Sequence, residues 1–285
     1  MAHRTDAHPD NVPGPFFVDR TCIDCGTCYQ FAPGTFSASG DHARVHAQPG
    51  QAEDRLRASM ALVACPVGSI GTEDRTEMAA AARAFPHPLA EQVSFCGYTS
   101  DKSFGASSYL IHRPDGNVLV DSPRAAEPLM KNLEALGGVS LLFLSHRDDV
   151  ADHAAYRARF GCERVMHEAD GMKGLERLVE GEAPIRLAED LLLIPTPGHT
   201  AGSACLLFRD FLFTGDHLWW NADKGRLSAS RAYNWHSWAQ QLDNLERLLA
   251  FDFSVVLPGH GSIHRAPSAA AMRNDLKAAI QALRG

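Results

Sequence analysis

Cysteine residues near the start of this sequence form the first group whose spacing could do chemistry. The run Cys22-Ile23-Asp24-Cys25-Gly26-Thr27-Cys28 is followed, further along the chain, by Cys65-Pro66. Thiolates at i, i+3 and i+6 can hold three corners of a cubane cluster, and a distant fourth cysteine can hold the last iron. We therefore predict one [4Fe–4S] cluster on Cys22, Cys25, Cys28 and Cys65. A zinc site with four thiolates is the alternative, but zinc ribbons usually present two Cys-x-x-Cys pairs.

Histidine and aspartate residues form the second group. They lie in four short segments, each directly after an apolar stretch: Ser145 to His153, Pro197 to Ser203, Thr214 to His217, and Pro258 to Gly261. The ends of several strands in one sheet meet at one edge, so side chains that follow different strands can come together. Imidazole nitrogen and carboxylate oxygen suit Zn²⁺, iron or Mn²⁺. The pattern predicts a metal site at this edge.

A metal in such a site permits hydrolysis. It lowers the pKa of a bound water to near 7, which gives a hydroxide nucleophile, and it polarises a carbonyl or phosphoryl oxygen. A carboxylate such as Asp152 could orient the hydroxide and accept its proton. The substrate would be a small molecule, an ester, thioester, lactone or lactam.

The elements that must position these residues are readable from periodicity. Leu56, Met60 and Val63 share one face of a predicted helix over 52–64. From residue 91 onward, short apolar strands alternate with turns and helical patterns, which indicates an α/β domain. We expect a disordered leader at 1–14, a cluster domain at 15–72, a linker at 73–90 and a second domain at 91–285.

Composition excludes several classes of protein. The 285 residues are 45% hydrophobic and 21% charged, as in an ordinary globular protein. Lys plus Arg is 27 and Asp plus Glu is 34, a net charge of −7, which is unfavourable for nucleic-acid or anionic-membrane binding. Apolar runs are too short to span a membrane, and the N-terminus lacks a signal-peptide core. We expect a cytoplasmic protein with reduced cysteines.

Both groups of residues resemble known families. The cysteine triplet with Cys65-Pro66 resembles a single-cluster bacterial-type ferredoxin over about residues 15–72. The Pro-Gly-His-Thr-x-Gly-Ser, Thr-Gly-Asp and Pro-Gly-His-Gly elements, over about 92–268, resemble the metallo-β-lactamase-fold superfamily. The resemblance implies a ferredoxin-like α+β domain followed by a four-layered αβ/βα sandwich with a metal site along one edge.

The first histidine segment departs from the superfamily pattern His-x-His-x-Asp-His. Asp148 stands where the second histidine is usual, and Asp152-His153 arrives two residues late. The resemblance implies that His146 and His199 hold a first metal, with Asp148 as a third ligand where it replaces the usual histidine. It also implies that Asp152, His153 and His260 hold a second metal and that Asp216 bridges both. Asp149 is an alternative ligand because the register is uncertain. The site would therefore hold one or two zinc or iron ions.

Three functions are consistent with this sequence. A metal-dependent hydrolase is favoured slightly over an iron oxidoreductase whose second centre receives electrons from the fused ferredoxin domain. The Asp148 departure favours iron, since carboxylates suit harder, redox-active ions. A redox-sensing or scaffold module, in which the cluster only stabilises the fold, comes third. A redox partner protein could dock on the N-terminal domain.

Overall fold

The computed structural model describes residues 2–285, which form two compact units. The first unit contains the chain up to Ser140 together with Ala151–Gly161. The second contains Leu141–Val150 and Cys162–Gly285. This division differs from the predicted boundary at residues 73–90. That segment holds α3 (Met78–Arg83) and β5 (His87–Ala90), and β5 pairs with the next strand, so it is structured rather than a linker.

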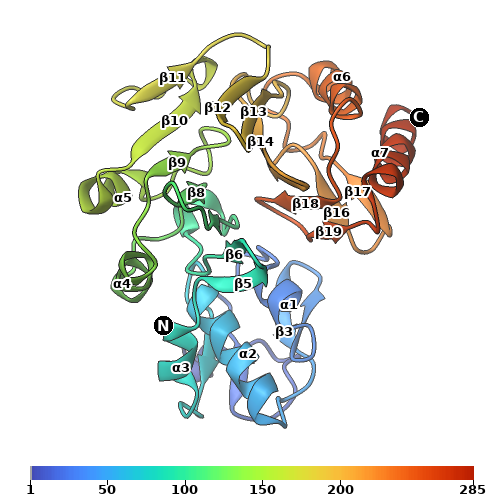
Figure 1. Cartoon of the computed structure of the whole chain (residues 1–285). Coiled ribbons are helices and arrows are strands. Elements are labelled where there is room, and N and C mark those ends of the chain that lie inside the picture. The colour runs from blue at the N-terminus through green and yellow to red at the C-terminus, as the bar shows by residue number, and fades with distance from the viewer. Residues whose placement is uncertain (1) are drawn as a thin grey trace. The chain divides into compact units, whose positions relative to one another are not determined.

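The cysteine-rich part of the first unit consists of short elements around a small core. They are β1 (Phe16–Val18), α1 (Thr27–Phe31), β2 (Phe36–Ser39), β3 (His42–Val45), α2 (Ala52–Ala64) and β4 (Ile70–Thr72). β1 pairs antiparallel with β4, and β2 with β3. The predicted helix over 52–64 is confirmed as α2, which packs beside α1 and α3 (Figure 1).

The chain before β1 is folded against this core. A short 3₁₀ helix, η1, spans Arg4–Asp6, and the amide of His8 donates to the carbonyl of Val18 at 2.9 Å. The side-chain oxygen of Asn11 accepts from the amides of Val18 and Val45, both at 3.0 Å. The expectation of a disordered leader is therefore wrong for residues 2–14, because their polar groups find partners on β1 and β3.

The rest of the first unit holds an antiparallel run of strands with helices. Its elements are α3, β5, β6 (Val93–Phe95), η2 (Asp101–Ser103), β7 (Tyr109–Ile111), β8 (Val118–Val120), α4 (Glu127–Ala135) and α5 (His153–Phe160). The strands β5, β6, β7 and β8 pair in chain order, each antiparallel to the next. β6, β7 and β8 are buried throughout.

The second unit carries three groups of strands. Its elements are β9 (Leu141–Phe143), β10 (Glu163–His167), η3 (Glu168–Asp170), β11 (Arg177–Val179), β12 (Ile185–Ala188), β13 (Leu191–Pro195), β14 (Ala204–Phe208), β15 (Phe211–Gly215), β16 (Trp219–Asn221), β17 (Arg226–Ser228), α6 (Trp238–Leu248), β18 (Val255–Pro258), β19 (His264–Arg265) and α7 (Ala269–Arg284). β9, β10 and β11 are parallel. A six-stranded sheet has the order β12-β13-β14-β15-β18-β19, and β16 and β17 form an antiparallel pair.

Helices α6 and α7 lie side by side and cover this six-stranded sheet (Figure 1). Each turns an apolar stripe inward, since Leu242, Leu245 and Leu248 on α6 recur every three residues and are buried. They share a core with buried residues of the sheet, among them Leu212 and Val256.

Strand direction explains how the histidine segments meet. β15 and β18 are parallel neighbours, with Gly215 opposite Pro258, so the segments that follow them leave at the same edge. β9 and β13 also end directly before their segments.

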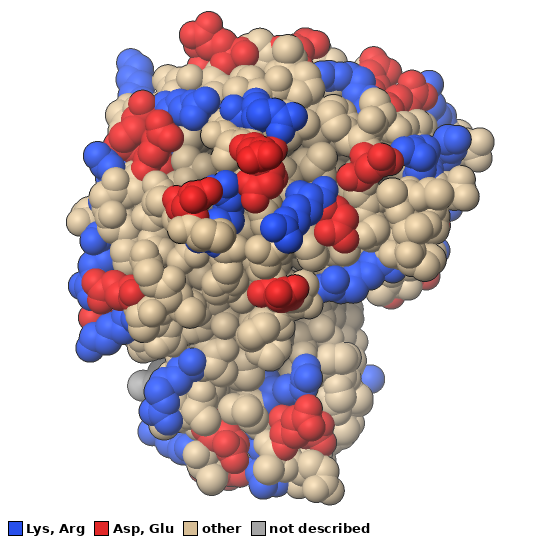
Figure 2. Space-filling view, viewed as in Figure 1, with Lys and Arg blue, Asp and Glu red and all other residues tan. Residues whose placement is uncertain are grey.

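The described residues contain no helix long and apolar enough to cross a membrane. Figure 2 shows basic and acidic side chains interspersed on the viewed face, without a large area of one sign.

Candidate functional site

The four predicted cluster ligands line one cavity. Its wall is formed by Cys22, Cys25, Cys28 and Cys65, together with neighbours such as Val18 and Ile70. Burial raises the pKa of the Cys28 thiol well above its usual value, and the other three sulfurs raise it further. Four clustered thiolates therefore need positive charge among them, which the iron of a cluster supplies.

Hydrogen-bonding groups face the sulfur atoms. The amide of Ala43 donates to Sγ of Cys22 at 3.4 Å, and the hydroxyl of Ser69 lies 3.3 Å from Sγ of Cys65. Gly105 closes over Cys25, since a Cβ there would lie 2.7 Å from Cβ and 2.9 Å from Sγ of that cysteine. These residues fit an iron–sulfur cluster, whose sulfurs accept such bonds.

The second set of predicted ligands converges on Asp216. Its Oδ2 lies 3.8 Å from Nε2 of His146, of His199 and of His260. Nε2 of His199 also lies 3.7 Å from Oδ2 of Asp148. These separations are longer than hydrogen bonds but suit an ion between the atoms, with bonds of about 2.0–2.2 Å to each.

Several of these candidate ligand atoms are buried and make no hydrogen bond. Among the described residues, Nε2 of His146, Nε2 of His199 and Oδ1 of Asp216 are buried and have no hydrogen-bond partner. Such atoms cost free energy unless a cation satisfies them. Burial lowers the pKa of His146 although the Asp216 carboxylate opposes this, so its imidazole is neutral and can bind a metal. The donor set fits a metal ion.

Two glycines allow the carboxylates and imidazoles to approach closely. Gly215 has a φ of +48°, and a Cβ there would lie 2.4 Å from Oγ of Ser145, whose hydroxyl holds Nδ1 of His146 at 2.9 Å. A Cβ on Gly259 would lie 2.7 Å from Oδ2 of Asp149 and 2.8 Å from Oδ1 of Asp216. Backbone therefore forms the wall behind the ligands.

Asp149 and Asp148 both lie close to the candidate histidine ligands. Two sets of side chains have ligand atoms within 4.8 Å of one another: His146 with Asp148 and His199, and His146 with Asp149 and Asp216. Asp149 is buried, whereas the Asp148 side chain is 44% exposed and faces solvent at the edge of the site. The imidazole of His199, whose Nε2 lies 3.7 Å from Oδ2 of Asp148, lowers the pKa of Asp148 and so keeps it a carboxylate.

Asp152 and His153 are not brought into these sets. They belong to the first unit, where Oδ1 of Asp152 lies 2.6 Å from Nζ of Lys102 and Oδ2 accepts from the amide of Ala125 at 2.9 Å. Both carboxylate oxygens of Asp152 are thus engaged. That Asp152 and His153 bind a metal, and that Asp152 activates water, stay predictions.

Asp170 is a positioning residue that the motif comparison missed. Its Oδ2 accepts from the amide of Arg147 at 2.8 Å and from the hydroxyl of Thr200 at 2.9 Å, and its Oδ1 accepts from the amide of Gly202 at 2.7 Å. It thereby ties the residue after His146 to the residue after His199. An acidic residue three positions after the end of the strand Glu163–His167 was the signal that could have found it.

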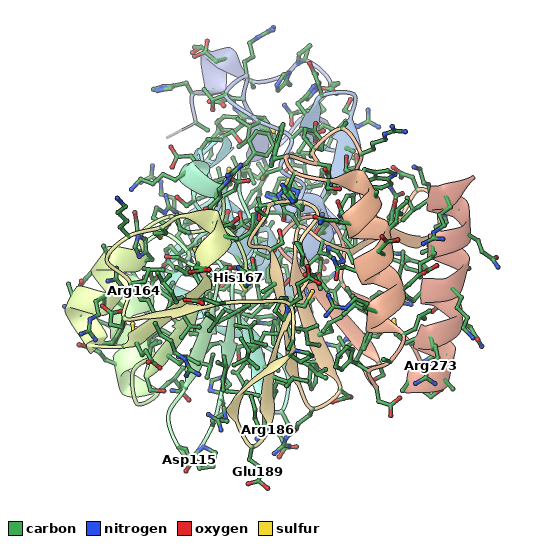
Figure 3. The ribbon with its side chains drawn as sticks, turned by 90° about the horizontal axis from the view of Figure 1, so that it is seen from above. Asp115, Arg164, His167, Arg186, Glu189 and Arg273 are labelled. Carbon is green, nitrogen blue, oxygen red and sulfur yellow. The ribbon has the colours of Figure 1, made fainter. Side chains whose placement is uncertain are left out.

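The strand before Asp170 is itself anchored. Arg164 and His167, labelled in Figure 3, are both on β10. The guanidinium of Arg164 makes two hydrogen bonds of 2.9 Å to the carboxylate of Glu176, and Nε2 of His167 lies 2.9 Å from the carbonyl of Gly181. β10 is therefore fixed where it delivers Asp170.

Family comparison agrees with both centres. The model of the metallo-beta-lactamase superfamily matches residues 102–260, and the model of the 4Fe-4S single cluster domain of ferredoxin I matches residues 18–72. The chain belongs to the metallo-β-lactamase superfamily and carries a ferredoxin-type domain at its N-terminal end. Both predicted resemblances are confirmed, as is the mixed α/β fold class.

Curated relatives include hydroxyacylglutathione hydrolases. That of Rhizobium etli is 33% identical over 161 residues, which cover 53% of this chain and 60% of the relative. That of Shewanella loihica is 29% identical over 164 residues, with 53% and 60% covered. The chain thus spans about 60% of the length of these relatives. The solved structure of BLEG-1 B3 metallo-β-lactamase is 18% identical with a TM-score of 0.50, covering 64% of this chain and 96% of that one, and shows the shared fold.

Proposed function

We propose that this protein is a metal-dependent hydrolase of small thioester, ester or lactone substrates. The observation that carries the proposal is the convergence of three imidazoles on Oδ2 of Asp216, each at 3.8 Å. His146, His199, Asp148 and Asp216 would hold the first metal. Asp149, Asp216 and His260 would offer a second position, so the site would take one or two zinc or iron ions.

The chain's own residues would divide the work of hydrolysis. A metal held here supplies a water of lowered pKa and polarises the substrate carbonyl. The neutral imidazole of His146 and the carboxylate of Asp216 would hold that ion. Asp148, partly exposed and kept ionised by His199, would bind the ion through one carboxylate oxygen and would use the other to orient the attacking water and accept its proton.

The relatives favour a thioester as the first substrate to test. Hydroxyacylglutathione is a thioester by its name, and the matched region of this chain includes all four histidine segments of the superfamily pattern. The carbonyl of a thioester is attacked readily once it is polarised, since the thiolate leaves as a stable anion. That the substrate is a small molecule, and that it is a thioester, are both part of this proposal.

Hydrolysis of a defined panel tests the proposal. Protein purified without oxygen would be assayed with a hydroxyacylglutathione, an oxygen ester and a lactone. We expect turnover of at least one, with kcat/KM falling roughly 10² to 10³-fold in His199→Ala because the metal is lost. His46→Ala, at an exposed histidine outside the site, is the matched control and should keep full activity. Failure of metal-replete protein to hydrolyse any of the three would count against the hydrolase.

An iron oxidoreductase is the second candidate. Two imidazoles and one carboxylate around one point, His146, His199 and Asp216, are the donor set of many non-haem iron enzymes. The ferredoxin-type domain would provide electrons, and a small redox partner protein could supply that domain. Reduced protein would be mixed with oxygen, and this candidate expects cluster reoxidation to slow in His199→Ala. Equal rates in both proteins would argue against it.

The oxidation state of the cysteines indicates the cellular compartment of the protein. None of the seven is in a disulfide among the residues that the structure describes. Thiols in this number are typical of a reducing compartment, so we place the protein in the cytoplasm as part of the proposal.

A further inference from the structure

Two imidazoles and a carboxylate lie together on the ferredoxin-type domain, away from the cluster cysteines in sequence and outside the histidine site. They are His8 and Asp10, which precede β1, and His42, the first residue of β3. One ligand atom from each lies within 4.8 Å of the other two. We propose that His8, Asp10 and His42 form a third metal site, which binds a divalent cation such as Zn²⁺ or Co²⁺ and modulates the iron–sulfur cluster.

The spacing of the donor atoms suits such an ion. Nε2 of His42 lies 3.2 Å from both carboxylate oxygens of Asp10. Ligands of a tetrahedral ion with bonds of 2.0–2.1 Å stand roughly 3.3 Å apart. The ring of His8 stacks on that of His42, with centroids 3.6 Å apart and planes 9° from parallel, so a second nitrogen donor is at the same range. Because an imidazole lone pair lies in its ring plane, binding one ion would turn the two rings out of this parallel stack until both nitrogens point at it.

The donors are already oriented by neighbouring groups. Oδ1 of Asp41 lies 3.1 Å from Nδ1 of His42, so a proton on Nδ1 can be donated to it and the Nε2 lone pair is left for a metal. The hydroxyl of Ser39 donates to Oδ2 of Asp10 at 2.6 Å. The amide of His8 is bonded to the carbonyl of Val18, which fixes that residue on the core. This is the arrangement that metal-binding histidines typically have.

Charge and burial point to a cation as well. Asp10 and Asp41 bring two negative charges, which a doubly charged ion would match. Nε2 of His8 is buried and has no hydrogen-bond partner among the described residues. Arg20 is a basic residue whose charge acts on His8, and it does not cancel the two carboxylates. Two nitrogens and one oxygen favour Zn²⁺ or Co²⁺ over Ca²⁺ or Mg²⁺, which prefer oxygen alone.

The site is connected directly to a cluster ligand. His42 precedes Ala43, whose amide donates to Sγ of Cys22 at 3.4 Å. A divalent cation on His42 would add positive charge beside this sulfur and draw the amide into a more polarised state. Reduction adds an electron to the cluster, so a nearby cation stabilises the reduced form and raises its reduction potential. The site would therefore make the electron affinity of the cluster depend on metal supply.

Metal counting on the full chain tests the binding claim. Protein with its cluster assembled would be titrated with Zn²⁺ alone by calorimetry, and with Co²⁺ alone by absorbance. We expect His8→Gln and Asp10→Asn each to bind one equivalent less than the unmodified chain, while His46→Gln, an exposed histidine of the same domain, binds the full number. Equal stoichiometry in all four proteins would overturn the site and leave His42 as an ordinary ion pair with Asp10.

A redox titration tests the coupling. In the unmodified chain, Zn²⁺ should shift the reduction potential of the cluster to a more positive value, and in Asp10→Asn the shift should disappear. Unchanged cluster absorbance at a given protein concentration would show that the variants are folded. An unchanged potential in the unmodified chain would overturn the regulatory role. This inference does not rest on the proposed hydrolase, since thioester hydrolysis by His8→Gln should match that of the unmodified chain.

Discussion

Nζ of Lys102 lies 2.6 Å from Oδ1 of Asp152, the carboxylate that the superfamily pattern would place on a metal. The amide of Ala125 donates to the other oxygen of Asp152 at 2.9 Å. This ion pair gives Asp152 a structural role in the first unit. Asp149, three residues earlier, lies instead with His146 and Asp216 in a set that could hold an ion.

Replacement of Asp152 by asparagine tests whether this carboxylate stabilises the fold through Lys102 or binds a metal. We expect Asp152→Asn to keep its bound metal and to lose about 1 kcal/mol of unfolding free energy, the size of one hydrogen bond to a partly exposed charge. Urea unfolding with metal analysis measures both. Loss of metal from the variant, with stability unchanged, would restore Asp152 as a ligand.

The pH dependence of the same pair has a defined sign. Burial raises the pKa of Asp152, but the hydrogen bonds from Lys102 and Ala125 and the charge of Lys102 outweigh it, so the pKa is lowered. A lowered pKa stabilises the fold above the ordinary value of about 3.9, and this stabilisation is lost as the pH falls through the folded-state pKa. The stability gap between the parent and Asp152→Asn should therefore be full at pH 7 and should close as the pH falls through the lowered pKa of Asp152. A stability difference that stays constant with pH would contradict a stabilising ion pair between Lys102 and Asp152.

Asp170 should control the metal site without touching the metal. In Asp170→Ala, the amides of Arg147 and Gly202 and the hydroxyl of Thr200 lose a buried acceptor. We expect metal affinity to fall roughly 10- to 100-fold and stability to fall by about 2–3 kcal/mol. Competition with a chromophoric chelator measures the affinity. Asp115→Ala, at an exposed residue labelled in Figure 3, is the control. Unchanged metal affinity in Asp170→Ala would show that the segments carrying His146 and His199 keep their positions without Asp170.

A methyl group on Gly259 should damage the site sterically. Its Cβ would lie 2.7 Å from Oδ2 of Asp149 and 2.8 Å from Oδ1 of Asp216, so both carboxylates must move. We expect Gly259→Ala to bind metal at least about tenfold more weakly. Gly34→Ala places its methyl group in open space and should match the parent. The proposed ligand geometry predicts a clear difference between the two, and equal affinities would refute it.

Substitution to serine distinguishes the cysteines that bind the cluster from those that do not. Cys65→Ser should lose the iron and the visible absorbance of the cluster, since a hydroxyl is a poor ligand for its iron. Cys96→Ser should keep both. Cys96 is fully buried outside the cluster cavity, and burial raises the pKa of its thiol to about 12, so it stays protonated and unreactive. Iron analysis after anaerobic reconstitution measures the cluster content of each variant. Iron loss from both variants would contradict the assignment of Cys65 alone of the two as a cluster ligand.

Much of the fold was predictable because its signals are local. The apolar runs that became β7, β8, β13 and β14 are short and bounded by turn residues, and the periodic run 52–64 became α2. The leader at 2–14 was mispredicted because its polar composition resembles disorder, while its partners on β1 and β3 are brought close only by folding.

The site was predicted in outline and altered in detail. His146, His199, Asp216 and His260 follow strands and carry recognisable flanking glycines, so their convergence could be anticipated. The choice between Asp149 and Asp152 could not, because it depends on Lys102, fifty positions before Asp152 in the chain. Asp170 and the His8 group depend on similar contacts between distant residues.

Metal analysis of a cluster-free variant tests the central proposal most directly. Cys22→Ser, purified without oxygen, should lose nearly all its iron while about one or two zinc ions per chain stay at the second site, in addition to any ion on His8, Asp10 and His42. It should also keep its thioester hydrolysis, which needs no electrons. Zinc retention with activity is the result that we predict. Substantial iron remaining in the variant, without hydrolysis, would contradict the hydrolase and assign the second site to an iron oxidoreductase.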